Sequence, residues 1–399
     1  MLSCRTFDRG KALFIRLLIA SLLGLCPLLL ETKECRATGG VDQDVLRGIH
    51  LLYEWETDRA EDCFREVVER KPKDPAGYFY LSMVSWSRLA IGFWTQAVVK
   101  EYIERIDRAI AVAREQIEDG NATAWTYFYL GGALGFKGRF HLMERKWFAS
   151  FLLAVDAVEA LKTCQRMDPL NKDVLLGLGI FDYYTAKMSG VLKFLTYLFV
   201  HRGDREEGIR KLHIAAREAV YSTWEARSVL LHIYLFMEED FSRALSLAGE
   251  LADRFPSISR YRYFEGLAYL RIGMDSAYRR TVDAMRQVYW RSGSSAKAVF
   301  WTRQALYLEA ARDLFEGLTE EARAKLDTLL SMADPVSDPL MIAWPVLKKG
   351  MSYDLDGQRD RALEYYTRVL EMENGAGAQF LAQKYSENPV KAKDPFLGY

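Results

Sequence analysis

One pattern of small, aromatic and proline residues recurs near both ends of the chain with the same internal spacing. Between residues 41 and 74 it occupies positions 8, 20, 24, 27 and 32 of a 34-residue unit, as Gly48, Ala60, Phe64, Val67 and Pro72. It returns at positions 8, 11, 15, 20, 24 and 27 of a later unit, as Gly350, Tyr353, Gly357, Ala362, Tyr366 and Val369. Such a unit suits two packed helices, because small residues let the helices approach each other and a proline ends the second helix. The spacing therefore predicts a chain built from repeated helix pairs.

Apolar residues recur with helical periodicity along almost the whole chain, and no alternating strand pattern interrupts them. Weaker matches extend the pattern to eight units, whose position 8 is taken by Gly48, Ser82, Gly131, Gly179, Leu230, Gly266, Ala310 and Gly350. The intervals between these residues are 34, 49, 48, 51, 36, 44 and 40, so three middle units are enlarged. The additional residues are the aromatic or apolar stretches Leu89–Val99, Phe140–Leu153 and Tyr184–Val200. Three enlarged units in succession are expected to place these stretches along one side of the array.

The general pattern resembles the tetratricopeptide repeat (TPR). This resemblance covers roughly residues 41–375. It implies an all-α fold, in which about eight TPR-like helix pairs with three enlarged middle repeats form a right-handed superhelix.

The central segment also resembles the tetratricopeptide repeat protein thirty-nine family of eukaryotes, which includes the yeast inclusion-body-clearance protein. The resemblance rests on Gly179-Ile180-Phe181, on the apolar run Val191–Leu195 and on the turn Gly203–Glu206. Ser189-Gly190 stands where the family usually has two prolines. The resemblance implies a non-enzymatic helical scaffold, in a family with members linked to lipid handling and to the clearance of protein inclusions.

Residues 1–37 have the composition of a signal peptide. A basic start is followed by Leu17–Leu30, fourteen residues without a charge, a length too short to cross a bilayer comfortably. Small residues at Cys35 and Ala37 permit cleavage after Ala37, and an uncleaved membrane anchor is the alternative. We therefore expect an exported protein, periplasmic or secreted, or one anchored through this segment. Residues 41–375 would form its repeat domain and 376–399 a C-terminal tail.

Composition argues against several classes of function. Lys and Arg together number 54, as do Asp and Glu, so no basic surplus indicates a nucleic acid partner. Beyond the leader only Cys63 and Cys164 remain, without metal-like spacing; two buried thiols are expected, and a disulfide between them stays open. The five histidines form no H-E-x-x-H motif, and the sequence has no G-x-S-x-G motif or phosphate-binding loop. The sequence therefore predicts no enzymatic activity and no cofactor or metal.

The turn Gly203–Glu207 offers a local structural explanation for its charges. Asp204 is expected to cap the helix that begins beside it, where Glu206 and Glu207 favour the positive end of that helix. Arg205 is then free to pair with a carboxylate or a backbone carbonyl. The alternative is that Arg205 holds an anionic ligand.

The TPR resemblance also implies a concave groove lined by the first helix of each pair. The aromatic residues that this spacing places in the groove are Phe79, Tyr80, Trp86, Phe128, Tyr129, Tyr183, Tyr184, Tyr263 and Phe264. Together with Arg205 they form the predicted partner-binding groove, because paired rings can clamp an extended peptide or an acyl chain. The alternative is that one ring of each pair belongs to the core.

The sequence thus predicts a non-enzymatic scaffold of the cell envelope that binds a protein or peptide partner. The alternative is a lipid or acyl-chain carrier that uses the apolar inserts. For the run Val191–Val200 we expect an extra packed helix, because it lacks the polar face of a surface-seeking helix. Contact with a membrane surface or with a lipid is the alternative for this run.

Overall fold

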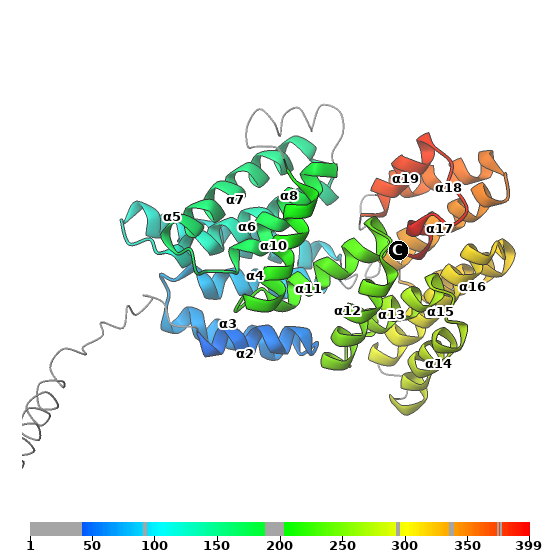
Figure 1. Ribbon diagram of the computed structural model, residues 1–399, viewed down its shortest axis with the longest axis horizontal. Helices are drawn as coiled ribbons and strands as arrows, with labels where there is room; N and C mark the ends of the chain where they lie inside the picture. Colours follow the sequence, from blue (N-terminus) through cyan, green and yellow to red (C-terminus); the bar gives the residue numbers. More distant parts are fainter. Residues whose placement is uncertain are drawn as a thin grey trace, which may run out of the picture. The chain divides into compact units, whose positions relative to one another are not determined.

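The computed structural model describes residues 42–90, 94–187, 203–292, 296–334, 339–372, 375 and 377–399. Within these ranges the protein is all-α, with seventeen α-helices, one π-helical segment, one short 3₁₀ helix and no strand (Figure 1). The all-α prediction is confirmed for these residues. The expected leader, residues 1–37, lies outside them.

The helices follow one another through short connections. The first group is α2 (Gln43–Tyr53), α3 (Thr57–Arg70), α4 (Pro75–Ala90), α5 (Gln96–Glu118), α6 (Ala124–Met143), α7 (Trp147–Met167), α8 (Val174–Lys187) and α10 (Arg205–Glu218). Next come α11 (Thr223–His232), the π-helical η1 (Ile233–Met237), α12 (Phe241–Arg254), α13 (Ser259–Arg271) and α14 (Asp275–Ser292). The chain continues with α15 (Ala296–Glu316), α16 (Thr319–Ser331), α17 (Pro339–Leu355), α18 (Arg359–Glu371), α19 (Ala378–Glu387) and the 3₁₀ turn η2 (Pro395–Gly398).

Each helix packs against the next described helix along the chain. The eight position-8 residues of the sequence pattern lie on α2, α4, α6, α8, α11, α13, α15 and α17, and all eight are buried. Among the described helices, the pattern residues therefore lie on alternate helices from α2 to α17.

The glycines of this pattern mark close approaches between helices. A Cβ atom on Gly48 of α2 would lie 2.3 Å from the ring of Phe64 on α3, and one on Gly350 of α17 would lie 2.6 Å from the ring of Tyr366 on α18. Both aromatic rings are completely buried. The two terminal units thus make the same crossing, and only a residue without a side chain leaves room for the ring.

Two of the three enlarged units gain their length mainly from longer helices. α5, α6 and α7 have 23, 20 and 21 residues, whereas α2 and α3 have 11 and 14. The stretch Phe140–Leu153 forms the end of α6, a short turn and the start of α7. The other two stretches are described only in part. Residues 91–93 of Leu89–Val99 and residues 188–200 of Tyr184–Val200 lie outside the described residues. The run Val191–Val200 therefore lies outside them as well.

Residues 377–399, which the sequence assigns only as a tail, contribute side chains to the packed interior. Leu381 of α19 is 4% exposed and Leu397 of η2 is completely buried, and both share a hydrophobic cluster with α17 and α18. Among the described helices, none has the length and apolar character needed to cross a membrane.

Some contacts connect helices far apart in the sequence. The backbone N–H of Asp42 donates to the hydroxyl of Tyr221 over 2.8 Å, and the ring of Tyr53 stacks on Phe255 with 4.9 Å between centroids. Trp55 lies edge-on to Phe300 at 5.0 Å. A repeat array in which each unit touches only its neighbours does not produce such contacts.

Candidate functional site

The predicted aromatic residues of α4 and α6 form one packed cluster. Phe79 and Tyr80 lie 5.7 and 6.0 Å from Tyr129, and Phe128 lies 5.1 Å from the same ring. All four rings are buried. In the pairs Phe79–Tyr80 and Phe128–Tyr129, both rings therefore belong to the core, whereas the alternative from the sequence placed only one ring of each pair there.

Two predicted aromatic residues keep contact with solvent. Trp86 is half-buried; its ring lies 5.5 Å from that of Phe136, and the guanidinium of Arg139 lies 5.1 Å from its centroid. Tyr184 is 40% exposed, beside the completely buried Tyr183. Of the nine predicted rings, seven are buried, so partner binding by the full set stays a prediction.

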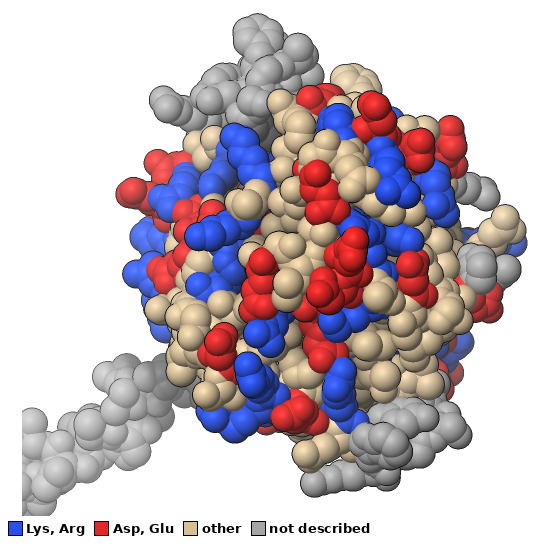
Figure 2. Space-filling model, turned by 90° about the vertical axis from the view of Figure 1, so that its right-hand side faces the viewer, with Lys and Arg blue, Asp and Glu red and all other residues tan. Residues whose placement is uncertain are grey.

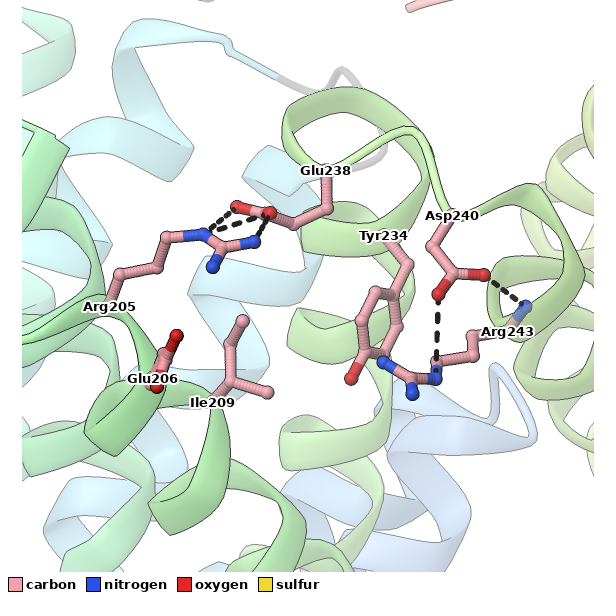
Figure 3. A pocket seen from close by; sticks show the side chains of 7 residues that line it. All are labelled: Arg205, Glu206, Ile209, Tyr234, Glu238, Asp240 and Arg243. Carbon is pink, nitrogen blue, oxygen red and sulfur yellow. Dashed lines mark hydrogen bonds and ion pairs between the residues drawn. The ribbon is translucent and has the colours of Figure 1, made fainter.

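Arg205 makes a structural ion pair at the start of α10. The side chain of Asp204 accepts a hydrogen bond from the backbone of Glu207 at 2.9 Å and caps the helix, as the sequence predicts. Arg205 donates through two nitrogens to the carboxylate of Glu238, which lies just beyond η1 (Figure 3). The hydroxyl of Tyr183 donates to the same carboxylate at 2.5 Å. Glu238 therefore joins two predicted site residues, Arg205 and Tyr183.

These contacts stabilise the charged form of Glu238. The hydrogen bond from Arg205, followed by those from Tyr183 and Lys187, lowers its pKa to about 2, although burial opposes this shift. A carboxylate only 9% exposed requires such partners, because an unpaired buried charge is strongly unfavourable. The arrangement explains Arg205 without a ligand.

A pocket of about 280 Å³ opens beside this ion pair, between α10, η1 and the start of α12 (Figure 3). Besides Arg205 and Glu238, its lining includes Tyr234, Asp240 and Arg243. Arg243 pairs with Asp240 at 3.4 Å and lies 5.4 Å from the ring of Tyr234. Both arginines of the pocket are thus paired with carboxylates of the protein itself.

A second site lies on α13, α15 and α17, where the aromatic face holds another part of the same chain. Tyr263 of α13 is 3% exposed, and its hydroxyl donates to the carbonyl oxygen of Gly398. Lys348 of α17 is 1% exposed, and its ammonium group donates to the carbonyl oxygen of Phe396. Between these two carbonyls, the side chain of Leu397 is completely buried. The segment Pro395–Tyr399, at the end marked C in Figure 1, is therefore held through its main chain and one aliphatic side chain.

Aromatic rings surround this segment. The ring of Tyr399 lies 4.8 Å from Trp344 of α17 and 4.9 Å from Phe236 of η1. Phe396 is parallel to Phe236 at 6.3 Å. Phe264, the second predicted aromatic of α13, contacts Phe236 at 5.9 Å and forms part of the same wall. Of the predicted groove residues, Tyr263 and Phe264 thus lie at a site that contains a peptide segment.

Sequence reasoning missed Lys348, although its setting gives a signal. It directly follows the apolar stretch Ala343–Leu347, where a lysine on a buried helix face needs a special partner. Burial lowers its pKa to about 7, and the charge of Asp394 partly opposes this shift. The nearby hydroxyl of Tyr307, whose ring lies 5.9 Å from the Lys348 nitrogen, is buried and has no hydrogen-bond partner among the described residues.

The two cysteines of the described chain are free and buried. Burial raises the pKa of the Cys164 thiol to about 12, which keeps it protonated at neutral pH. In the described ranges, no three His, Cys, Asp or Glu side chains are grouped as metal ligands.

Charges are mixed on the face of the molecule shown in Figure 2, where Lys and Arg alternate with Asp and Glu without a broad region of one sign. This distribution agrees with the equal number of basic and acidic residues in the sequence. This face therefore has no continuous basic surface of the kind that binds a nucleic acid backbone.

Comparison with known proteins assigns the chain to no family. No protein-family model and no curated protein sequence matches it.

Proposed function

We propose that this chain is a non-enzymatic, TPR-like scaffold that binds a protein or peptide partner on the aromatic face of its first helices. In this proposal the helices form eight pairs of a right-handed superhelix. The protein acts in the cell envelope, after export directed by residues 1–37.

The observation that carries the proposal is the way α13, α15 and α17 hold Pro395–Tyr399. Tyr263 and Lys348 donate to two main-chain carbonyls, a type of contact that any peptide can provide. Specificity then comes from the buried Leu397 and from the rings around Tyr399. Main-chain hydrogen bonds combined with one apolar pocket are a general means of recognising short peptides.

The experiment separates the segment from its site. The chain ending at Asp394 is mixed with a fluorescent peptide of residues 391–399, and binding is followed by fluorescence anisotropy. The shortened chain is expected to bind the peptide. The intact chain is expected to bind it at least about tenfold more weakly, because its own segment fills the site at a high effective concentration.

Two peptides provide the matched comparison. Leu397→Asp in the peptide places a charge in the buried position and should abolish binding, whereas Lys391→Ala changes an exposed residue and should leave it unchanged. If the shortened chain does not fold, the intact chain cut at a protease site introduced at the exposed residues 391–393 tests the same contact. Rapid loss of the cut segment from a folded chain, or equal binding of both peptides, contradicts the proposal.

A further inference from the structure

Five large apolar side chains are exposed together around the connection between α6 and α7. Leu142 lies in the last turn of α6, Trp147 and Phe148 begin α7, and Leu152 follows one turn later; they are 41%, 40%, 67% and 48% exposed. Phe380 of α19 is 58% exposed, and its ring lies 5.9 Å from that of Trp147. These five residues are the α6–α7 apolar patch.

Helical geometry explains why this patch faces outward. Phe148 and Leu152 are four residues apart and so lie on the same side of α7, while Phe151 between them is buried. The helix therefore has apolar residues on two sides at its start, although only one side is needed for the core. Several large apolar side chains exposed around one connection are typical of an interaction surface, whereas single exposed apolar residues need no explanation.

Positive charge lies directly beside the patch. Arg145 and Lys146 form the turn before Trp147, and both are exposed. Lys146 pairs with Glu144 at 3.0 Å, whereas the side chain of Arg145 makes no ion pair or hydrogen bond with any described residue. The N-terminus of α7 has no side-chain cap, so its first backbone N–H groups add to the positive potential.

We propose that the α6–α7 apolar patch is a membrane-docking surface for a bilayer that contains anionic lipids. Trp147, Phe148 and Leu152 enter the boundary between headgroups and acyl chains. Arg145 and the uncapped N-terminus of α7 meet the lipid phosphates. Exposed aromatic and aliphatic side chains next to an unpaired basic side chain are the chemistry of peripheral membrane binding. This inference uses other residues than the proposed peptide site and does not depend on it.

The test uses the full chain with a polarity-sensitive dye on its single exposed cysteine. Cys4, Cys26 and Cys35 are changed to Ser, and the buried Cys63 and Cys164 are left in place. The dye is attached at Leu152→Cys or, as a matched control, at Leu170→Cys, where an exposed leucine lies beyond the opposite end of α7, about 30 Å from the start of that helix. On vesicles of phosphatidylcholine and phosphatidylglycerol, emission at position 152 should shift to shorter wavelength. Emission at position 170 should not change, even if another part of the chain tethers the protein to the vesicle.

A glycine substitution separates binding from folding. Arg145 has a positive φ of 63°, a conformation that glycine adopts without strain, so Arg145→Gly should not destabilise the fold. It should raise the vesicle concentration for half-maximal dye response about fivefold, because one basic group near an anionic surface contributes about 1 kcal/mol. Lys393→Gly relieves the same backbone strain at φ 68° elsewhere and should leave the response unchanged.

Three outcomes overturn the inference. One is an unchanged emission at position 152 while the chain co-sediments with the vesicles. Another is an equal response to vesicles of phosphatidylcholine alone. The third is a shift at position 152 that grows with protein concentration in the absence of vesicles, because it assigns the patch to contact with a second copy of the chain.

Discussion

Gly179 allows the backbones of α8 and α10 to touch. A Cβ atom at this position would lie 2.9 Å from the carbonyl oxygen of Gly208 and 2.9 Å from Leu212 Cγ. A carbonyl within a helix cannot move aside as a flexible side chain can. This glycine therefore sets the distance between the two helices of the central unit.

Gly179→Ala is expected to lower the free energy of unfolding by about 2 kcal/mol, since overpacking of a core contact has this order of effect. Gly135→Ala is the matched control: its Cβ atom would meet only Ala157 Cβ, at 4.0 Å. There, the higher helix propensity of alanine should leave stability unchanged or slightly raised. The midpoint of urea unfolding, followed by far-UV circular dichroism, measures both. Equal midpoints for the two variants exclude the close approach.

Lys348 should make stability depend on pH above neutrality. Its pKa is about 7 in the folded protein, against an ordinary value of 10.5, because burial disfavours the charged amine. Between these values the unfolded chain binds more protons than the folded one, so stability rises with pH across this window. Below pH 7 the penalty for the buried charge is fully present; above 10.5 both states are neutral and the penalty is gone.

Comparison with Lys348→Met isolates this contribution. The difference in unfolding free energy, wild type minus variant, is expected to rise by up to about 1.4 kcal/mol per pH unit between pH 7 and pH 9. Urea unfolding at several pH values measures this slope. The loss of the hydrogen bond to Phe396 changes the free-energy difference by the same amount at every pH and therefore does not alter the slope. Parallel stability curves for the two proteins contradict the assignment.

At the scale of the elements, Asp173 connects the start of α8 to the turn between α10 and α11. Its carboxylate is 2% exposed and accepts three backbone hydrogen bonds, from Val220 at 3.0 Å and from Tyr221 and Ser222 at 2.7 Å. These donors have no regular helical partner at this turn. One side chain therefore fixes where α11 begins relative to α8.

Asp173→Ala should destabilise the protein by about 3 kcal/mol or more, because it leaves several buried N–H groups unsatisfied. Asp204→Ala is the comparison: it removes one exposed helix cap and should cost about 1 kcal/mol. Thermal unfolding, followed by circular dichroism, ranks the two variants. A smaller loss for Asp173→Ala than for Asp204→Ala contradicts this account of the turn.

The elements themselves could be predicted from the sequence because their signals are local. Gly48 and Phe64 are sixteen residues apart, and so are Gly350 and Tyr366, so a fixed spacing reveals the crossing. The Asp204 cap is likewise a local signal. The same reasoning could not find the occupant of the α13 face, because Tyr263 and Gly398 are 135 residues apart and no period relates them.

At the scale of the whole molecule, the described chain departs from a simple repeat array. The hydroxyl of Tyr53 donates to Glu225 at 3.0 Å, across 172 residues, and its ring stacks on Phe255. These contacts join the first helix pair to α11 and α12. The spacing of apolar residues identifies which face of α2 is buried, but it does not specify whether a neighbouring or a distant helix covers that face. Sequence periodicity therefore predicts the pairs better than the contacts between distant pairs.

These distant contacts predict a pattern of hydrogen exchange. Tyr53→Ala removes the stacking on Phe255 and the hydrogen bond to Glu225, so amide exchange should accelerate both in α2 and at residues 251–255, the end of α12. Tyr78→Ala is the control, because its contacts are with nearby elements: its hydroxyl donates to the carbonyl of Pro72 at 3.1 Å, and its ring lies 5.4 Å from the guanidinium of Arg108 on α5. Its effect should stay within α3, α4 and α5. In an array whose units touch only their neighbours, the effect of Tyr53→Ala would end at α4. Faster exchange at 251–255 therefore shows that distant helix pairs stabilise each other in addition to neighbouring ones. Unchanged exchange there contradicts the distant contact.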